Sequence, residues 1–470
     1  MTPTLIDILR SELGDDRICN DPVVLATRRF DRWCIKHYRD WMGRTIAAPG
    51  IVVRPQCTAD VQQLMRFASR HRIAVIPFGL GSGVCGGIEP DPDDILLDMS
   101  SMNRVIDIDT TDLLARFEAG INGLEAEQRV AEHGLTIGHW PQSVAISSVG
   151  GWVSTRASGQ FSTAYGNIED MVYSLEVVLP SGELAVLGKA PRASAGPDLR
   201  HLFMGAEGCL GVITGVTLSL RRQPEKQVVS AFYCPSMAVG FDAQRQIVQA
   251  DWRPPVMRQY DASEVARLFP ESVSNDRGLL LMVHEGPATR VEVEIAAIES
   301  MMQRCGLEPA DSTATRAWLE RRNHVPEWTD LLDQGLIADT IEVSGTWQQI
   351  DRIYHDVTNA LRTVPHIVNA SAHSSHVYRS GINLYFTFAC MPPEREQMEA
   401  LYFECWDKAL AATAAAGGGI AHHHGAGRLR KPYLHHDLGT AGIDLLHRLK
   451  RSIDPDGLMN PGNLLPTCYD

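Results

Sequence analysis

Three consecutive histidines near the carboxyl end of the chain are the residues whose types most clearly suggest chemistry. His422, His423 and His424 lie between two glycine-rich segments and are followed by Arg428 and Arg430. Imidazoles transfer protons near neutral pH and bind metals, and guanidinium groups bind phosphate or carboxylate. On an extended backbone, His422 and His424 share one face and His423 takes the other. The run is therefore a metal-binding segment, an exposed turn or an active-site loop. The arginines that follow it are suited to binding an anion.

A tyrosine within an alternating segment is the second candidate for chemistry. Asn383, Tyr385 and Thr387 are separated by apolar residues, as in a strand with one face toward a pocket and the other toward a core. A tyrosine hydroxyl has a pKa of about 10 and needs a neighbour that lowers it before it can act as a base. We expect a histidine from 422–424 to be that neighbour.

Two glycine-dense stretches, PFGLGSGVCGG at 77–87 and SSVGGWVSTRASG at 147–159, interrupt apolar strand patterns. Glycine removes the Cβ and permits positive φ, so successive N–H groups can converge on phosphate oxygens. A single stretch of this kind is often only a tight turn. Two of them favour a long anionic cofactor bound along the backbone.

The composition is that of a globular enzyme with more than one domain. A chain of 470 residues is too long for one hydrophobic core. With 43 basic against 57 acidic residues, the net charge of −14 argues against a nucleic-acid-binding surface. The ten cysteines include no Cys-x-x-Cys, so neither a zinc site nor a disulfide framework is indicated. No signal peptide or membrane-spanning apolar run is evident, so we expect a cytoplasmic protein without stable membrane insertion.

The periodicity of the apolar residues predicts an α+β chain. In the first half we expect a helix at 58–72 and strands at 73–78, 95–99, 105–108, 175–179 and 212–220. In the second half we expect strands at 278–283 and 383–389 and helices at 291–305, 347–363 and 395–415. The first glycine stretch lacks the G-x-G-x-x-G spacing of the doubly wound dinucleotide fold.

These elements group into four parts. We expect an N-terminal helical segment at 1–46, a domain with both glycine stretches at 47–224 and a second α+β domain at 225–420. A C-terminal segment at 421–470, which holds the histidine run, is expected to return to the first domain.

Four stretches together resemble the FAD-binding domain of the vanillyl-alcohol oxidase / p-cresol methylhydroxylase flavoprotein family. They are the two glycine stretches, YGNIEDMV at 165–172 and GAEGCLGVIT at 205–214. The GGW-x-x-T-R-A-S-G…YGNIED run at 150–170 and HHHGAGRLRK at 422–431 are most similar to the alkylglycerone-phosphate synthase-like subgroup. The resemblance covers about 50–470 and implies a two-lobed FAD-binding domain of the p-cresol methylhydroxylase type with a second, substrate-capping α+β domain.

The resemblance implies FAD as the cofactor. We expect noncovalent binding, because no histidine lies at 77–87 and Cys85 is interpreted as a packed thiol. The first glycine loop would cradle the pyrophosphate, 142–148 and 155–158 would line the flavin, and 205–211 would hold the adenosine end. The cofactor-binding residues expected on this basis are Pro77, Phe78, Gly79, Leu80, Gly81, Ser82, Gly83, Gln142, Ser143, Ser147, Ser148, Gly151, Thr155, Arg156, Ala157, Ser158, Glu207, Gly208, Gly211 and Ile213.

The resemblance also implies roles for the catalytic candidates. Tyr385 would act as acid and base, and the histidines at 422–424 would handle protons and bind the anionic head of the substrate. Related flavoproteins that oxidise 2-hydroxy acids hold a metal through a G-N-L-H histidine and an E-H-G glutamate. Tyr385 and His423 stand at those two positions here, so only His376 remains and we expect no metal.

One residue departs from the synthase-like pattern. That subgroup has an arginine where this chain has Trp328 or Thr329, and Arg321 and Arg322 could replace it only if the local helix shifts. The leading hypothesis is therefore an FAD-dependent oxidoreductase that oxidises an anionic alcohol or hydroxy acid by hydride transfer to flavin. The alternative is alkylglycerone-phosphate synthase, a non-redox exchange of acyl for alkyl through a flavin adduct.

A third class is a non-catalytic flavin-binding protein, which would hold FAD that no substrate reduces. The tyrosine and the histidine run make this class unfavourable. The expected partner is a small anionic substrate with no nucleic acid, and a homodimer is left open.

Overall fold

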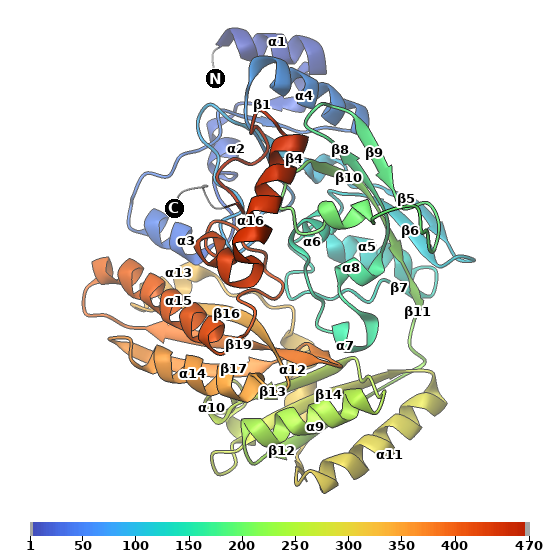
Figure 1. Cartoon of the computed structure of the whole chain (residues 1–470), viewed down its shortest axis with the longest axis vertical. Helices are drawn as coiled ribbons and strands as arrows, with labels where there is room; N and C mark the ends of the chain where they lie inside the picture. The colour runs from blue at the N-terminus through green and yellow to red at the C-terminus, as the bar shows by residue number, and fades with distance from the viewer. Residues whose placement is uncertain (1–2, 466–470) are drawn as a thin grey trace.

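Short β-branched runs build the first lobe of the N-terminal domain. β2 and β3 pair in parallel with β4, and β1 adds an antiparallel edge, in the order β1-β2-β4-β3. The computed structural model describes residues 3–465, and Figure 1 shows this lobe at the top of the molecule. Its elements are α1 (Pro3–Leu13), β1 (Ile18–Cys19), α2 (Pro22–Ala26), α3 (Cys34–Trp41), β2 (Ile51–Val53), α4 (Thr58–His71), β3 (Val75–Phe78) and β4 (Ile95–Asp98).

A second sheet forms the other lobe. Its five antiparallel strands follow the order β5-β6-β10-β8-β9, and its core contains Phe117 and Trp152. The elements of this lobe are β5 (Val105–Asp109), β6 (Leu114–Glu118), α5 (Gly123–Ala131), β7 (Leu135–Thr136), α6 (Val149–Thr155), α7 (Ser162–Tyr165), α8 (Ile168–Met171), β8 (Val172–Val178), β9 (Leu184–Leu187), β10 (Val212–Ser219) and β11 (Arg221–Arg222).

One large antiparallel sheet organises the second domain, which we call the cap domain. Its strand order is β15-β12-β14-β13-β17-β19-β16, with β18 paired to β19. The strands are β12 (Lys226–Cys234), β13 (Val256–Tyr260), β14 (Gly278–Gly286), β15 (Glu308–Pro309), β16 (Ile337–Thr346), β17 (Ile367–Ser374), β18 (Val377–Tyr378) and β19 (Gly381–Cys390).

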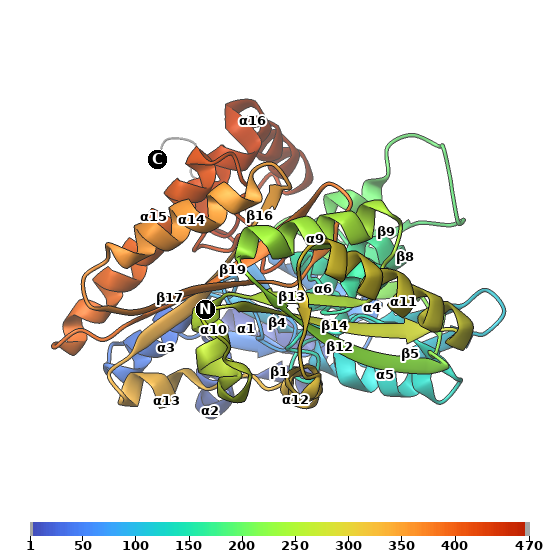
Figure 2. The same cartoon turned by 90° about the horizontal axis from the view of Figure 1, so that it is seen from below.

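The helices of the cap domain divide between the two faces of its sheet. α9 (Met237–Gln249), α11 (Ala288–Arg304), α14 (Ile350–Arg362) and α15 (Met398–Ala415) lie together on one face, as Figure 2 shows. α10 (Ala262–Leu268) and α12 (Thr313–Arg321) lie on the other, while α13 (Trp328–Asp333) packs on α3. The second face shares an apolar cluster with Phe161 of the N-terminal domain. The two domains therefore meet on the face of the cap sheet that α10 and α12 leave partly open.

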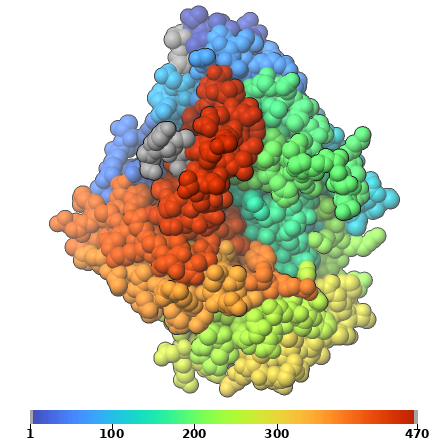
Figure 3. Space-filling view, viewed as in Figure 1, coloured from blue at the N-terminus to red at the C-terminus, as the bar shows by residue number. Residues whose placement is uncertain are grey.

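The chain ends on the N-terminal domain. α16 (Leu434–Ile453) runs along the two lobes, and Figure 3 shows it in red against their blue and green surface. Lys450 donates to the carbonyl oxygen of Cys209 at 2.7 Å, and Met459 pairs with Val75 in a parallel bridge. No helix in residues 3–465 is long and apolar enough to cross a membrane.

The predicted elements compare closely with those of the structure. The helix expected at 58–72 is α4, and the strand at 383–389 is β19. The helix expected from residue 347 begins at Ile350, and six strands of the cap sheet (β12, β13, β15, β16, β17 and β18) have no counterpart among the predicted elements. The predicted parts 1–46 and 421–470 extend slightly beyond the described residues. Mixed helices and sheets in two domains confirm the predicted α+β class.

Gly120 joins the two lobes of the N-terminal domain. It follows β6 of the second lobe, and its amide donates to the carbonyl oxygen of Met102, just beyond β4 of the first lobe, at 2.9 Å. A Cβ on Gly120 would overlap the carbonyl oxygen of Met99. The close approach of the two lobes therefore requires glycine at this position.

We predict that Gly120→Ala destabilises the protein by about 1–3 kcal/mol, because the backbone of the two lobes must move apart to admit the methyl group. Thermal unfolding followed by circular dichroism measures the effect. Gly87→Ala is the matched control, because a Cβ there meets only two carboxylate oxygens at 3.8 Å. An unchanged melting temperature for Gly120→Ala would contradict the assigned lobe contact.

Candidate functional site

Four side chains form a row across the cap sheet. Tyr260 pairs with His373, His373 with Tyr385, and Tyr385 with Glu342, on the successive strands β13, β17, β19 and β16. Directly opposed residues of neighbouring strands point to the same face. The His373 ring stacks on Tyr385 at 4.8 Å and 12° and on Tyr260 at 5.1 Å and 27°. The sheet thereby fixes Tyr385 between an imidazole and a carboxylate.

A hydrogen-bonded chain leads from Tyr385 into the histidine run. The Tyr385 hydroxyl contacts Nε2 of His423, and Nδ1 of His423 lies 2.7 Å from Nδ1 of His422. Nε2 of His422 lies 2.7 Å from the hydroxyl of Tyr378 on β18. Tyr378 also accepts from Nδ2 of Asn167 at 3.2 Å, which connects the chain to the N-terminal domain.

Burial keeps this chain neutral. It lowers the pKa of His422 to about 4 and that of His423 well below the usual value. The pKa of Tyr385 is raised, first by burial and then by the charge of Glu342. The expectation that a histidine would lower the pKa of Tyr385 is therefore wrong. The phenol stays protonated and the imidazole of His423 is the available acceptor.

A buried ion pair holds the histidine run against the sheet. Glu342 and Arg430 are both fully buried, and Nη1 of Arg430 lies 2.6 Å from Oε1 of Glu342. Glu342 also accepts from the backbone amide of His424 at 3.0 Å, and its other oxygen lies 2.9 Å from Nδ1 of His424. Burial alone would raise the pKa of Glu342, but Arg430 and His424 lower it below its usual range.

The two arginines predicted to bind substrate have other partners. Arg430 is committed to Glu342 and stacks 5.0 Å over Trp406. Arg428 pairs with Glu89 at 2.8 Å and donates to the carbonyl oxygens of Gly86 and Pro461. Both guanidinium groups are therefore engaged within the protein, which disfavours the substrate-binding role predicted for them. Each fastens the loop after the histidines instead.

Three histidines near Tyr385 lie close enough to hold a metal. Ligating atoms of His376, His422 and His423 are within 4.8 Å of one another. Nδ1 of His376 is already hydrogen-bonded to the Ser162 hydroxyl at 2.6 Å, and both nitrogens of His422 and His423 take part in the chain from Tyr385 to Tyr378. Hydrogen bonding accounts for the cluster, so the absence of a metal stays our prediction.

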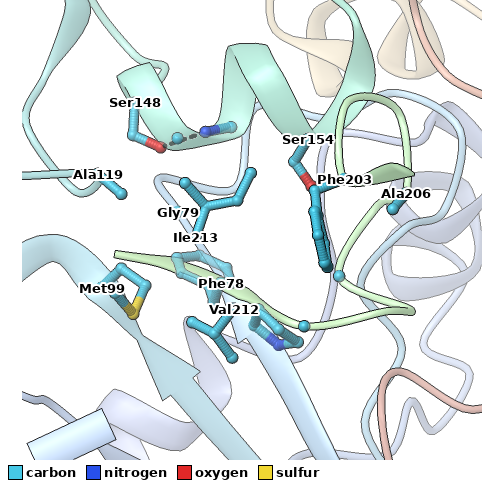
Figure 4. A pocket seen from close by; sticks show the side chains of 15 residues that line it. Phe78, Gly79, Met99, Ala119, Ser148, Ser154, Phe203, Ala206, Val212 and Ile213 are labelled. Carbon is cyan, nitrogen blue, oxygen red and sulfur yellow. Dashed lines mark hydrogen bonds between the residues drawn. The ribbon is translucent and has the colours of Figure 1, made fainter. Parts of the chain in front are cut away.

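The two glycine stretches meet at a narrow cavity between the lobes, shown in Figure 4. Eight of the expected cofactor residues line it: Pro77, Phe78, Gly79, Ser148, Gly151, Gly208, Gly211 and Ile213. Ala206, within the expected segment 205–211, lines it as well, whereas sequence reasoning missed Met99, Ala119, Gly150, Ser154, Phe203 and Val212. Most are small or apolar and carry no local signal of their own.

The remaining expected cofactor residues lie outside this cavity. Leu80 and Gly81 line a second cavity beside Arg28 and Arg29, and the neighbouring Ser82 and Gly83 complete that loop. Ser147, Thr155 and Ser158 donate to Ser143, Gly151 and Asn167 respectively. Gln142 donates to the carbonyl oxygen of His324, and Arg156, next to Ala157, pairs with Glu169.

The carboxylate of Glu207 is also engaged within the protein. It accepts from the amides of Ala426 and Gly427 at 2.6 and 3.0 Å and from the side chain of Asn463. Glu207 therefore anchors the loop after the histidine run, and its expected contact with a cofactor stays a prediction.

His139 is the strongest signal that a group binds beside the second glycine stretch. The residue is fully buried, yet neither ring nitrogen has a hydrogen-bond partner within residues 3–465. A buried polar atom is expected to have a partner. His139 lies three residues before the segment 142–148 expected to line the flavin. This orphaned imidazole and the cavity of small residues fit a flavin dinucleotide.

A second buried chain lies behind Tyr385 and was not anticipated. Nδ1 of His373 lies 2.9 Å from Glu264, and Nη2 of Arg258 lies 2.8 Å from Nε2 of His373. Because a guanidinium only donates, Nε2 of His373 accepts and Nδ1 carries the proton. A charged residue inside the apolar strand β13 was the available sequence signal for Arg258.

The pKa of His139 gives a test of its burial. Burial lowers this pKa to about 3 in the folded protein, whereas an unfolded histidine titrates near about 6.5. Below about pH 6.5, His139 binds a proton in the unfolded chain but stays neutral in the folded protein. The residue therefore lowers the free energy of unfolding as the pH falls.

We therefore predict that lowering the pH from 7.5 to 5 raises the free energy of unfolding of His139→Phe by about 2 kcal/mol relative to that of the wild type. Thermal unfolding of the holoenzyme at both pH values measures the change. Replacement of the exposed His436 by glutamine is the control. A difference between His139→Phe and wild type that does not vary with pH would show that His139 is not a buried neutral imidazole.

Two family models match most of the chain. Residues 49–188 match an FAD binding domain, and residues 223–464 match the C-terminal domain of FAD linked oxidases. An FAD-linked oxidoreductase of Escherichia coli, YgcU, is 34% identical over 98% of both chains. Alkyldihydroxyacetonephosphate synthase of Dictyostelium discoideum is 28% identical, over 100% of this chain and 82% of its own. Glycolate oxidase subunit GlcD of Bacillus subtilis is 27% identical, over 88% and 89%.

Solved structures agree with these matches. An alkyldihydroxyacetonephosphate synthase superposes with a TM-score of 0.83 at 25% identity, over 98% of this chain and 86% of that one. A p-cresol methylhydroxylase superposes with a TM-score of 0.78 at 15% identity, over 99% and 97%, which shows a shared fold. The predicted fold family, the FAD cofactor and an oxidoreductase activity are confirmed. The chain thus belongs to the family of FAD-linked oxidases.

Proposed function

We propose that this enzyme oxidises a small anionic alcohol or hydroxy acid and holds FAD noncovalently between the two lobes of its N-terminal domain. The observation that carries the proposal is the contact between the hydroxyl of Tyr385 and Nε2 of His423, a buried neutral imidazole. Oxidation of an alcohol needs a group that takes the hydroxyl proton as the hydride leaves. The Tyr385–His423 pair supplies that group.

The residues between the lobes suit the cofactor. Gly79, Gly151 and Gly208 would let the backbone approach the diphosphate, and Met99 and Ile213 would contact apolar parts of the molecule. His139 would gain a hydrogen-bond partner. When bound, FAD supplies the acceptor for the hydride from the substrate carbon.

The proton has a defined route through the chain. The substrate hydroxyl gives its proton to the oxygen of Tyr385 while Tyr385 gives its own to Nε2 of His423. Nδ1 of His423 can then pass a proton to Nδ1 of His422, whose Nε2 contacts Tyr378. Each transfer replaces one N–H or O–H bond with another, so no isolated charge is left on Tyr385. The half-buried Tyr378, next to the exposed Arg379, is the outer end of this route.

The second candidate is the non-redox exchange carried out by alkyldihydroxyacetonephosphate synthases, which are similar over almost the entire chain. One observation weighs against it. Thr329 is exposed on α13, and the indole of Trp328 donates to the carbonyl oxygen of Arg32. Neither side chain can replace the arginine that the resemblance implies at this place.

We predict that anaerobic addition of the substrate bleaches the flavin spectrum of the wild type, and that Tyr385→Phe slows this bleaching by about 10²–10⁴-fold. Candidate 2-hydroxy acids and alcohols are screened first, and stopped-flow absorbance then gives the rate. Tyr433→Phe is the matched control, because that hydroxyl contacts Asp407 away from the site.

Three results would point elsewhere. Flavin that no alcohol or hydroxy acid reduces but that acyl-glycerone phosphate perturbs would favour the synthase reaction. Bound flavin that responds to neither would indicate a binding protein. A purified protein without flavin would contradict the proposal as a whole.

The histidine cluster gives a separate prediction about metals. Dialysis against dipicolinate should leave the flavin-reduction rate unchanged, because the nitrogens of His422 and His423 are hydrogen-bonded in the chain to Tyr378. Metal analysis before and after dialysis checks the treatment. Loss of activity that added Zn²⁺ restores would show that His376, His422 and His423 hold a catalytic metal.

A further inference from the structure

Two arginines differ from all others inside the protein. Every other arginine in residues 3–465 that is buried or partly buried has a carboxylate oxygen within 4.0 Å of its guanidinium group. Arg258 and Arg322 are partly buried and have none among the described residues. Placing a guanidinium away from water costs free energy unless an anion compensates it. These two side chains therefore stand ready for an anion from outside the chain.

Arg258 is held by neutral groups beside the catalytic tyrosine. Its Nε donates to the hydroxyl of Tyr260 at 2.9 Å and its Nη2 to Nε2 of His373 at 2.8 Å. Its guanidinium lies 5.3 Å over the ring of Trp318. Nη1 has no hydrogen-bond partner within residues 3–465. Since His373 stacks on Tyr385, only one imidazole separates this cation from the Tyr385 ring.

Glu264 does not serve as the counter-ion of Arg258. Its carboxylate accepts from Nδ1 of His373, from the hydroxyl of Thr387 at 2.6 Å and from Arg267 at 3.1 Å. The imidazole of His373 lies between Glu264 and Arg258. Glu264 therefore fixes the tautomer of His373, and His373 in turn orients the guanidinium of Arg258.

Arg322 belongs to the cap domain and contacts the N-terminal domain beside the same cluster. It follows α12, one turn beyond Trp318, and lies 5.0 Å over both Trp140 and Phe161. Its Nη1 donates to Oε1 of Gln160 at 3.0 Å. Burial lowers the pKa of Arg322 to about 10, so it remains charged at neutral pH. Ser162, next to Phe161, contacts His376 of the histidine cluster.

One aromatic cluster connects the two cations. Phe161, Tyr260 and Trp318 are buried in the same apolar core, and Trp140 packs against it. Low-dielectric surroundings strengthen the attraction between a guanidinium and an anion, and the planar fork of arginine matches a carboxylate or a phosphate. The arrangement is suited to an oxyanion that enters between the domains.

We propose that Arg258 and Arg322 form the anion subsite of the active site, where they bind the carboxylate or phosphate group of a substrate whose hydroxyl reaches Tyr385. This inference rests on the proposed oxidation of an anionic alcohol. Arg258 and Arg322 take this role in place of Arg428 and Arg430. They lie on the opposite side of Tyr385 from Glu342. The reacting carbon would then lie between the anion subsite and the flavin.

Anion binding without turnover tests the subsite. Oxalate and inorganic phosphate are titrated separately into the holoenzyme, and changes in the visible flavin spectrum and isothermal calorimetry report binding. We expect at least one of the two anions to bind saturably to the wild type. Arg258→Gln and Arg322→Gln should each raise its dissociation constant by about ten- to hundredfold, because each removes charged hydrogen bonds. The anion that binds distinguishes a carboxylate site from a phosphate site.

Two further variants keep the result interpretable. Arg321→Gln removes a neighbouring exposed guanidinium that donates to the carbonyl oxygen of Leu268 and lies 5.2 Å over the Phe269 ring, and it should bind the anion as wild type does. Arg258→Lys retains the charge without the fork and should bind with intermediate affinity. If Arg258→Gln does not fold, the anion affinity of Arg258→Lys tests the role of Arg258 instead.

The outcomes separate this inference from the proposed function. If substrate reduces the wild-type flavin but both glutamine variants bind the anion as tightly as wild type, the subsite is wrong and the oxidation stands. If the variants lose anion binding while no alcohol or hydroxy acid reduces the flavin, the subsite stands and the oxidation is wrong. Absence of saturable binding of both anions to the wild type would overturn the subsite.

Discussion

The buried ion pair between Glu342 and Arg430 is the interaction on which the candidate site depends. Both side chains are fully buried, and moving two such charges out of water costs several kcal/mol per ion unless each is paired and hydrogen-bonded. Glu342 stands beside Tyr385 on the cap sheet, whereas Arg430 belongs to the segment that follows the histidine run. The pair therefore fixes the histidines relative to the tyrosine. The amide of His424, bound to the same carboxylate, leaves the loop little freedom to shift.

This ion pair also explains why the chain from Tyr385 to Tyr378 can stay neutral. Arg430 compensates the charge of Glu342, so neither His422 nor His423 has to carry a proton to balance it. Burial then disfavours the imidazolium form of His422 and His423. A neutral phenol–imidazole chain can accept a proton from an alcohol, while the positive charge required for an anionic substrate is supplied elsewhere, by Arg258 and Arg322. In the proposed enzyme, proton transfer and charge recognition are therefore carried out by different groups, with FAD between the lobes of the N-terminal domain.

The sequence predicts best those features that depend on residues close together along the chain. The glycine stretches impose their own backbone geometry, so eight of the residues they suggested line one cavity. Alternation along β19 correctly placed Tyr385 opposite the apolar core. The ion-pair partners of Arg428 and Arg430, Glu89 and Glu342, lie 339 and 88 residues away along the chain, so no local pattern indicated them. Arg258 and His373 meet only through the pairing of β13 with β17, a register that no local pattern encodes.

The protonation of His422 and His423 in the holoenzyme is the most direct test of this account. Nitrogen-15 nuclear magnetic resonance of histidine-labelled protein, with each signal assigned by single substitution, distinguishes a neutral imidazole from an imidazolium. The account predicts that both residues are neutral at pH 7 and remain so down to about pH 5. An imidazolium signal from either residue at pH 7 would contradict it, because Tyr385 would then have no neutral acceptor for its proton.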